Sequence, residues 1–210
     1  MHLPLPRLPY ADACDRSLLR AEAERPVVLA CVDRTLPQHD AALRKLGVQA
    51  QQYVDKGTLR PVDLCGREID PADLRGAYKR IAEACPAGPC AVVVDGLSTL
   101  TAASGSLLDA LALVRSLAAL AARSGSLLVL CAHGDVPGDG ALLQSAENLS
   151  DWSVEVAALE TGRSADVHGQ ILVRSRCGAE VPEHPGQLSG RWFYRLAEGP
   201  GLRFSTQAVL

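Results

Sequence analysis

Short apolar runs alternate with longer helical patterns from residue 26 onward, and this alternation constrains the fold more than any other feature. The strand-like runs cover residues 27–32, 58–64, 90–95 and 126–132. The helical patterns cover residues 38–46, 70–84, 107–122 and 142–148. Strands that alternate with helices are typical of βαβ units around a mostly parallel sheet. The sequence therefore predicts an α/β fold, with the runs at 27–32, 90–95 and 126–132 as buried strands.

Two of these helices carry more specific signals. Asp70 precedes Pro71, which is the arrangement of an N-cap followed by proline at the first helical position, so Asp70 is the expected start of the second helix. The pattern over residues 107–122 is apolar around most of its circumference. A helix of this kind is expected to be buried on more than its sheet-facing side.

Beyond residue 150 the apolar period changes to two. Residues 152–158, 168–176, 190–196 and 202–207 are predicted strands joined by glycine-rich or proline-rich turns, with no helix among them. We expect these strands to extend the same sheet in antiparallel fashion. The expected organisation is a partly irregular extension over residues 1–26 and one domain over residues 27–210.

Composition limits the function classes. The 210 residues carry a net charge of −3, so any contact with nucleic acid must come from a local patch. No apolar stretch reaches the roughly 18 residues of a membrane helix, and the amino end lacks a secretory pattern. We therefore expect a protein of the cytoplasm, with the nucleus as a second location, and without membrane contact. The seven cysteines are expected to be reduced thiols, and Cys85 and Cys90 have no second pair or histidine to complete a zinc site. Neither a metal nor a cofactor is expected.

Asp95 follows the apolar run 90–94 and has the form of a Walker B carboxylate, which holds Mg²⁺ or its water beside a nucleotide. His133 and Asp135 follow the next strand, at the same expected edge of the sheet. The printed sequence contains no G-x-x-x-x-G-K-[ST] loop and no Gly-Lys pair, so autonomous ATP hydrolysis is disfavoured. Asp95 remains either a capping or turn residue or part of a nucleotide contact completed by another subunit. Covalent catalysis is also disfavoured, since no G-x-S-x-G motif is present.

Arginines and aromatic residues alternate on the strands near the carboxyl end. With a period of two, Arg174 and Arg176 share one face of their strand, and Arg191, Phe193 and Arg195 share one face of the next. This pattern suits phosphate contact and base stacking, which makes the four arginines candidates for tRNA contact. Arginine on an exposed strand also prevents edge-to-edge aggregation without any ligand, and that alternative is the stronger one at this stage.

One segment carries a family resemblance. Residues 154–176, with the Thr161-Gly162 turn and the run Asp166-Val167-His168-Gly169-Gln170, resemble the corresponding hairpin of the sixth Elongator subunit family. Four shorter matches occur in the same order as in that family. They are Lys45-Leu46-Gly47-Val48 before Gly57, Asp95-Gly96-Leu97-Ser98, His133-Gly134-Asp135 and Ala208-Val209-Leu210.

The resemblance implies a RecA-like fold without a working phosphate loop. It also implies assembly with Elongator subunits four and five into a ring of six, which supports tRNA binding and wobble-uridine modification while catalysis resides in another Elongator subcomplex. Members of this family carry a further strand and helix before the equivalent of Val27, whereas 26 residues precede it here. The alternatives are a divergent RecA-superfamily ATPase in DNA repair or signalling, and an α/β scaffold with no role in nucleic-acid binding.

Overall fold

The computed structural model describes residues 25–65, 73–159, 162, 164, 167–175, 190–196 and 202–205. They fall into two compact units, and the boundary between the units in the chain lies between Leu149 and Ser150. We call residues 25–149 the parallel-sheet unit and the described residues from Ser150 onward the antiparallel-sheet unit. The expected extension over residues 1–26 lies almost entirely outside the described residues.

The parallel-sheet unit is built on four strands. They are β1 (Val27–Cys31), β2 (Leu59–Asp63), β3 (Ala91–Val94) and β4 (Leu127–Leu130). The strand order is β2-β1-β3-β4, and every neighbouring pair is parallel. The predicted α/β class is confirmed, and each of the four predicted strands is present with somewhat shorter bounds.

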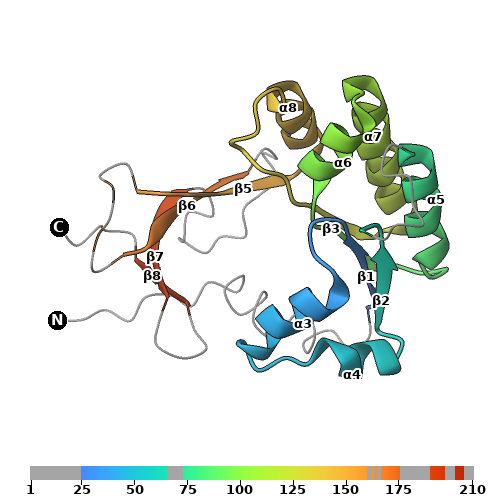
Figure 1. Ribbon diagram of the computed structural model, residues 1–210, viewed down its shortest axis with the longest axis horizontal. Helices are drawn as coiled ribbons and strands as arrows, with labels where there is room; N and C mark the ends of the chain where they lie inside the picture. Colours follow the sequence, from blue (N-terminus) through green and yellow to red (C-terminus); the bar gives the residue numbers. More distant parts are fainter. Residues whose placement is uncertain are drawn as a thin grey trace. The chain divides into compact units, whose positions relative to one another are not determined.

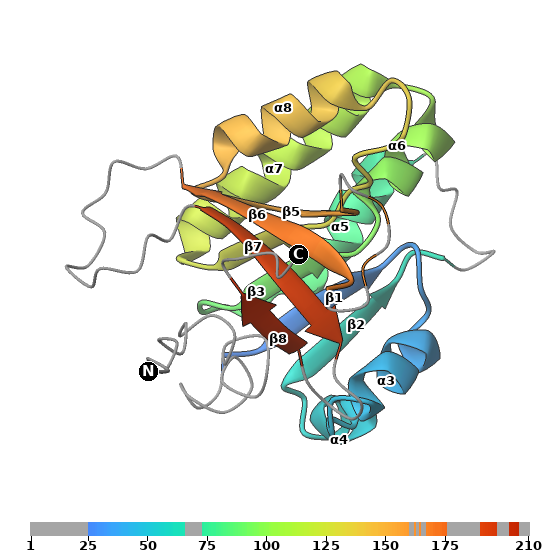
Figure 2. The same cartoon turned by 90° about the vertical axis from the view of Figure 1, so that its left-hand side faces the viewer.

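Six helices accompany this sheet in the described part of the chain. They are α3 (Leu36–Arg44), α4 (Ala50–Asp55), α5 (Leu74–Ala84), α6 (Leu97–Ser104), α7 (Leu107–Ser124) and α8 (Gly140–Leu149). Figures 1 and 2 show α3 and α4 on one side of the sheet and α5 and α7 on the other. None of the helices in the described part of the chain is long and apolar enough to cross a membrane.

The helix bounds correct the sequence prediction in two places. α5 begins at Leu74, and Asp73 is its N-cap, which accepts a hydrogen bond from the Gly76 N–H. The predicted N-cap Asp70 and Pro71 lie outside the described residues. α4 and α6 were not predicted. Both are short, at six and eight residues, and too short for a helical period to stand out from the neighbouring sequence.

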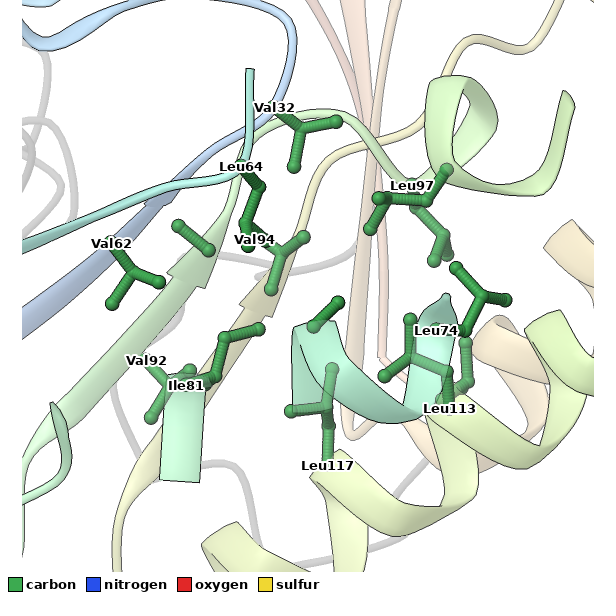
Figure 3. Packing of buried hydrophobic residues seen from close by; sticks show 14 of the residues in the cluster. Val32, Val62, Leu64, Leu74, Ile81, Val92, Val94, Leu97, Leu113 and Leu117 are labelled. Atoms are coloured by element: carbon green, nitrogen blue, oxygen red, sulfur yellow. The ribbon is translucent and has the colours of Figure 1, made fainter. Parts of the chain in front are cut away.

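The core lies between the sheet and the helices α5 and α7 (Figure 3). Val92 and Val94 point from β3 into this layer, toward Ile81 of α5 and Leu117 of α7. Val28 of β1 lies opposite Val92 in the sheet and belongs to the same cluster. All five side chains are fully buried. Burial of one such side chain stabilises the fold by about 1.5–3 kcal/mol relative to leaving it exposed, so this layer supplies much of the stability of the unit.

The wide apolar surface of α7 has a structural explanation. α7 packs against β4 and against three helices, α5, α6 and α8. Its buried residues are Ala110, Leu113, Val114, Leu117 and Ala121. The prediction that this helix is buried on more than its sheet-facing side is therefore confirmed.

The prediction of a fully buried strand was wrong for β4. Leu128 and Leu130 are half-buried, but Leu127 and Val129, which point to the opposite face, are 48% and 37% exposed. β4 is the last strand of the parallel sheet in the described part of the chain. A run that is apolar at every position cannot reveal from the sequence alone which of its two faces is covered.

The antiparallel-sheet unit contains β5 (Trp152–Ala157), β6 (Gly169–Ser175), β7 (Gly190–Leu196) and β8 (Leu202–Ser205). These strands pair in sequence order, and each pair is antiparallel. They form a sheet of their own, so the expected extension of the parallel sheet was wrong. The period of two predicts antiparallel strands with two different faces. It does not show whether one of these strands pairs with the edge strand of the parallel sheet.

Candidate functional site

Polar residues gather where the parallel strands end. Asp33 follows β1, Asp95 follows β3 directly, and His133 lies three residues beyond β4. The carboxyl ends of parallel strands meet at one edge of a sheet, and ligands of open α/β sheets bind outside that edge. We call this region the carboxyl edge.

The Asp95 carboxylate is engaged on both oxygens. Its Oδ1 accepts hydrogen bonds from the backbone N–H groups of Val32 and Asp33, and its Oδ2 accepts one from the Arg34 N–H at 3.2 Å. The Nε2 of His39 lies 2.7 Å from the same Oδ2. Only 9% of the Asp95 side chain is exposed. Asp95 therefore connects the turn after β1 to the end of β3. This is the role expected of a capping or turn aspartate.

A second set of contacts surrounds Asp33. The Thr99 hydroxyl donates to Asp33 Oδ1, and the Nε2 of His133 lies 3.0 Å from Asp33 Oδ2. The His133 N–H in turn donates to the buried Ser98 hydroxyl at 2.9 Å. These bonds tie together the segments that follow β1, β3 and β4.

Gly96 makes this arrangement possible. A Cβ on Gly96 would lie 2.6 Å from the Asp33 Cγ, which is closer than real side-chain atoms approach, and 3.0 Å from the Val32 Cβ, which is a tight contact. The glycine in the Asp95-Gly96-Leu97-Ser98 run thus lets the chain pass directly beside Asp33. This requirement of the backbone accounts for the residue without reference to any ligand.

The carboxyl edge is negatively charged. Asp33, Asp63 and Asp95 all lie near the ends of the strands, and no described group of three His, Cys, Asp or Glu residues is arranged to hold a metal ion. Burial, and to a smaller extent the negative charges of Asp95, Cys65 and Asp63, together raise the pKa of the Cys31 thiol to about 12. Cys31 therefore stays protonated near neutral pH and is not a nucleophile there.

The backbone geometry at this edge resembles an anion-binding site that is occupied by a side chain of the same chain. The N–H groups of residues 32–34 converge on one negatively charged group. Converging backbone N–H groups hold phosphate in many nucleotide-binding proteins, but here the anion is the Asp95 carboxylate. A phosphate group would have to displace that carboxylate and approach two further aspartates.

The structure brings only part of the predicted site together. Asp95 and His133 lie at the same edge, but each bonds to a different partner, His39 and Asp33 respectively. Asp135 lies in the exposed turn before α8. The sequence analysis did not identify Asp33, His39 or Thr99. Asp33 carries a signal of the same kind as Asp95, since a polar residue directly follows the end of an apolar run.

The arginines of the antiparallel sheet lie on a common face. Residues directly opposite each other on antiparallel strands project to the same side of the sheet, and the register sets Arg191 opposite Leu172. Arg174 therefore shares this side with Arg191 and Arg195. Arg203, which the sequence analysis missed, lies opposite Arg195 on β8. Arg176 is outside the described residues.

The resemblance motif has a structural role in this sheet. The Gln170 amide is buried and donates to the Ala158 carbonyl at 3.0 Å, and the His168 N–H donates to the Tyr194 carbonyl at 2.8 Å. The Tyr194 ring covers Gly169, where a Cβ would lie 2.6 Å from the ring. Asp166 is outside the described residues.

A pocket of about 430 Å³ lies beside this hairpin, lined by Ala158, Leu159, Gly162, Ser164, Val167 and His168. Among these lining residues His168 is the single titratable side chain.

The parallel sheet with its flanking helices and the separate antiparallel sheet together make a RecA-like fold. No family model matches the chain, and no curated protein matches it. Among solved structures, the chain is similar to the crystal structure of a KaiC-like protein from the hyperthermophilic archaeon Pyrococcus horikoshii OT3, with a TM-score of 0.60 and 11% sequence identity. The similarity covers 91% of this chain and 79% of that one. At this identity the comparison supports the shared fold alone.

Proposed function

We propose that the chain is a non-catalytic subunit of an Elongator complex. In this proposal it joins Elongator subunits four and five in a hetero-hexameric RecA-like ring, which supports tRNA binding and wobble-uridine (U34) modification by the catalytic Elongator subcomplex. The observation that carries the proposal is the carboxyl edge, where Asp95 fills the position of an anion within a RecA-like fold.

The contacts of Asp95 support a non-catalytic role. A Walker B carboxylate must present an oxygen to Mg²⁺ or to its bound water. Both Asp95 oxygens already accept hydrogen bonds from the protein, and the printed sequence contains no phosphate-binding loop. A RecA-like subunit with this edge is suited to assembly and scaffolding rather than to turnover.

Exposed apolar side chains support a role in an assembly. Trp152, Val154 and Val156 alternate along β5 and so share one face, and the two valines are 62% and 64% exposed. The register places Ile171, Val173 and Trp192 on the same face of neighbouring strands. Large contiguous apolar surfaces on soluble proteins mark interaction sites. We expect this face to contact a neighbouring subunit.

The order of the motifs makes Elongator the most specific candidate. Gly96, Gly169 and Gln170 belong to runs that resemble the sixth Elongator subunit family, and each has a contact that another residue type would disturb. A divergent RecA-superfamily ATPase in DNA repair or signalling is the second candidate, and the similarity to a KaiC-like protein favours it. Binding of nucleotide by the chain would separate the two.

Co-expression tests the proposal. The full chain is expressed with and without Elongator subunits four and five, and the products are analysed by size-exclusion chromatography with light scattering. We expect one hetero-oligomeric species with the partners and aggregation of the chain without them. A stable, monodisperse monomer at micromolar concentration that does not associate with either partner would contradict the ring.

A matched pair of variants locates the contact. Val154→Glu/Val156→Glu places charge on the apolar face, and we expect it to weaken association with the partners by at least about tenfold, which corresponds to 1.4 kcal/mol. Leu108→Glu makes a similar change at an exposed leucine of α7 and should leave association unchanged. Equal effects of the two variants would show that the apolar face of β5 is not the contact.

A further inference from the structure

One edge of the parallel sheet lacks the features that normally protect an exposed strand. In the described part of the chain, β2, β4, β5 and β8 are the outermost strands of the two sheets. Three of these strands carry a charge or a proline, namely Arg60, Pro61 and Asp63 in β2, Glu155 in β5 and Arg203 in β8. β4 and its flanking residues, 126–132, contain neither. Natural edge strands use charge and proline to prevent pairing with other chains, so β4 is open to such pairing.

The backbone of β4 has hydrogen-bonding groups on this free edge. The N–H groups of Leu127 and Cys131 donate to carbonyls of the β3 segment at 2.9 and 2.8 Å. Successive residues of a strand direct their N–H and C=O groups to opposite sides in the plane of the sheet. The N–H and C=O groups of Leu128 and Leu130 therefore point away from β3, and no described strand lies on that side. Together they form a short row of donors and acceptors that a further strand could pair with.

The side chains of β4 are apolar on both faces of the sheet. Leu128 and Leu130 are half-buried and pack against the core beneath α5 and α7. Leu127 and Val129 are exposed on the opposite face, and the β3 residues beside them are half-buried. An added strand would therefore have apolar neighbours on both faces. A charged side chain in that strand would lose hydration without gaining a partner from β4, so the edge favours an uncharged strand.

We propose that the free edge of β4 binds an extended, uncharged segment of a partner protein, which joins the four-stranded parallel sheet as a further strand. Such a segment matches the row at Leu128 and Leu130, since strands pair through alternating N–H and C=O groups at a spacing of about 4.8 Å. A helix bonds its backbone groups internally and could not pair with this edge. The partner is specified by these chemical properties, so the inference does not depend on the proposed function.

A peptide that can form a strand tests the proposal. The probe is a short fluorescent peptide of alternating threonine and valine with one lysine at each end. Its control is the same peptide with N-methyl groups on alternate residues, which removes the N–H groups needed for pairing. Fluorescence anisotropy measures binding to the dilute full chain, and we expect the control to have a Kd at least about tenfold higher, which corresponds to 1.4 kcal/mol. Equal binding of the two peptides, or binding of neither, would overturn the proposal.

Charge substitutions beside the edge locate the binding site. Leu127→Glu/Val129→Glu adds two negative charges on the exposed face of β4, and we expect it to raise the Kd of the probe at least about tenfold. Leu108→Glu/Leu149→Glu makes the same change of charge at exposed leucines of α7 and α8 and should leave the Kd unchanged. Both variants attract the lysines of the probe, so the comparison isolates the edge, and circular dichroism confirms that each is folded. Equal Kd values for the two variants would overturn the assignment to β4.

Hydrogen exchange of single amides, read by mass spectrometry, identifies what occupies the edge. Exchange at Leu128 and Leu130 should be fast in the free chain and at least about tenfold slower with the probe bound, whereas exchange at Val129, whose N–H points toward β3, should not change. Unchanged exchange at Leu128 and Leu130 would overturn the proposal. Slow exchange there in a free monomer would show that a segment of the same chain occupies the edge. Slow exchange in a dimer that Leu127→Glu/Val129→Glu dissociates would assign the edge to a second copy, and either result would overturn the partner strand.

Discussion

The two sheets of this protein are both rich in valine and leucine, yet they place these residues in opposite surroundings. Val28 and Val92 of the parallel sheet are fully buried beneath α5 and α7, whereas Val154 and Val156 of the antiparallel sheet are mostly exposed. The difference follows from α5 and α7, which cover the face of the parallel sheet that carries Val28 and Val92, whereas the described residues after Ser150 contain no helix.

The charged residues differ in the same way. Asp95 and Asp33 of the parallel-sheet unit bond to groups of their own unit and hold its loops together. Arg195 and Arg203 of the antiparallel-sheet unit are exposed and lie opposite each other. The aspartates of the carboxyl edge thus stabilise the loops of their own unit, whereas these two arginines lie at the surface of theirs.

The largest expected effect is on stability, at Asp95. Asp95→Ala leaves the backbone N–H groups of residues 32–34 and the His39 ring without their acceptor. We expect the free energy of unfolding to fall by about 2–4 kcal/mol in a urea titration, because the donors of a nearly buried carboxylate lose charge-assisted hydrogen bonds. Asp135→Ala, an exposed aspartate beyond β4, should change it by less than about 0.5 kcal/mol. Equal small effects would mean that Asp95 does not hold the turn.

Substitutions at two glycines test close packing in both units. The added Cβ of Gly96→Ala would clash with Asp33 in one unit, and that of Gly169→Ala would clash with the Tyr194 ring in the other. Each is expected to lower the free energy of unfolding by about 1–3 kcal/mol, as other overpacked sites do. Gly88→Ala, where an added Cβ meets no atom within 4 Å, is the matched control.

Double-mutant cycles identify the cause of each loss. In a background of Asp33→Ala, Gly96→Ala should cost much less, and in a background of Tyr194→Ala the same should hold for Gly169→Ala. Costs that are independent of these backgrounds would show that the neighbouring side chain is not the obstacle.

The smallest effect concerns pH. The folded pKa of Cys31 is raised to about 12 by burial and by the charge of Asp95, while an unfolded cysteine ionises near its ordinary value of about 8.5. The unfolded state therefore loses its proton first, so this contribution to stability is complete below about pH 8.5 and is lost as pH rises toward 12. Cys31→Ala should flatten the fall in stability above pH 9. If Cys31→Ala leaves the dependence of stability on pH unchanged, the Cys31 thiol has the same pKa in the folded and the unfolded chain.

Much of the parallel sheet could be predicted from the sequence, because apolar runs separated by helical periods leave few other folds. The exposed face of β4 could not be predicted from the sequence, because a continuously apolar run has the same pattern whether one or both of its faces are covered. The start of α5 at Leu74 was missed because Asp70 and Asp73 both have the chemistry of an N-cap. Choosing between them requires the hydrogen bond from the Gly76 N–H, which is a matter of geometry.

The candidate sites were predictable to different degrees. Asp95 could be found because a carboxylate after an apolar run is a recognisable pattern, but its partner His39 is 56 residues distant in sequence, and only the pairing of β1 with β3 brings the two together. Arg174, Arg191 and Arg195 were found from the period of two. Arg203 was not, since the relation between strands depends on their register, which turn lengths and side-chain packing decide.

A nucleotide titration tests the central claim, which is that the carboxyl edge of this RecA-like fold is filled by its own aspartate and does not bind nucleotide. Isothermal titration calorimetry of the full chain, alone or with its partners, measures binding of ATP in the presence of Mg²⁺, with Asp95→Asn and Asp135→Asn as paired variants. For the chain itself we expect no saturable heat at millimolar ATP and no turnover. If ATP binds and Asp95→Asn abolishes that binding while Asp135→Asn does not, Asp95 serves a nucleotide site and the account is contradicted.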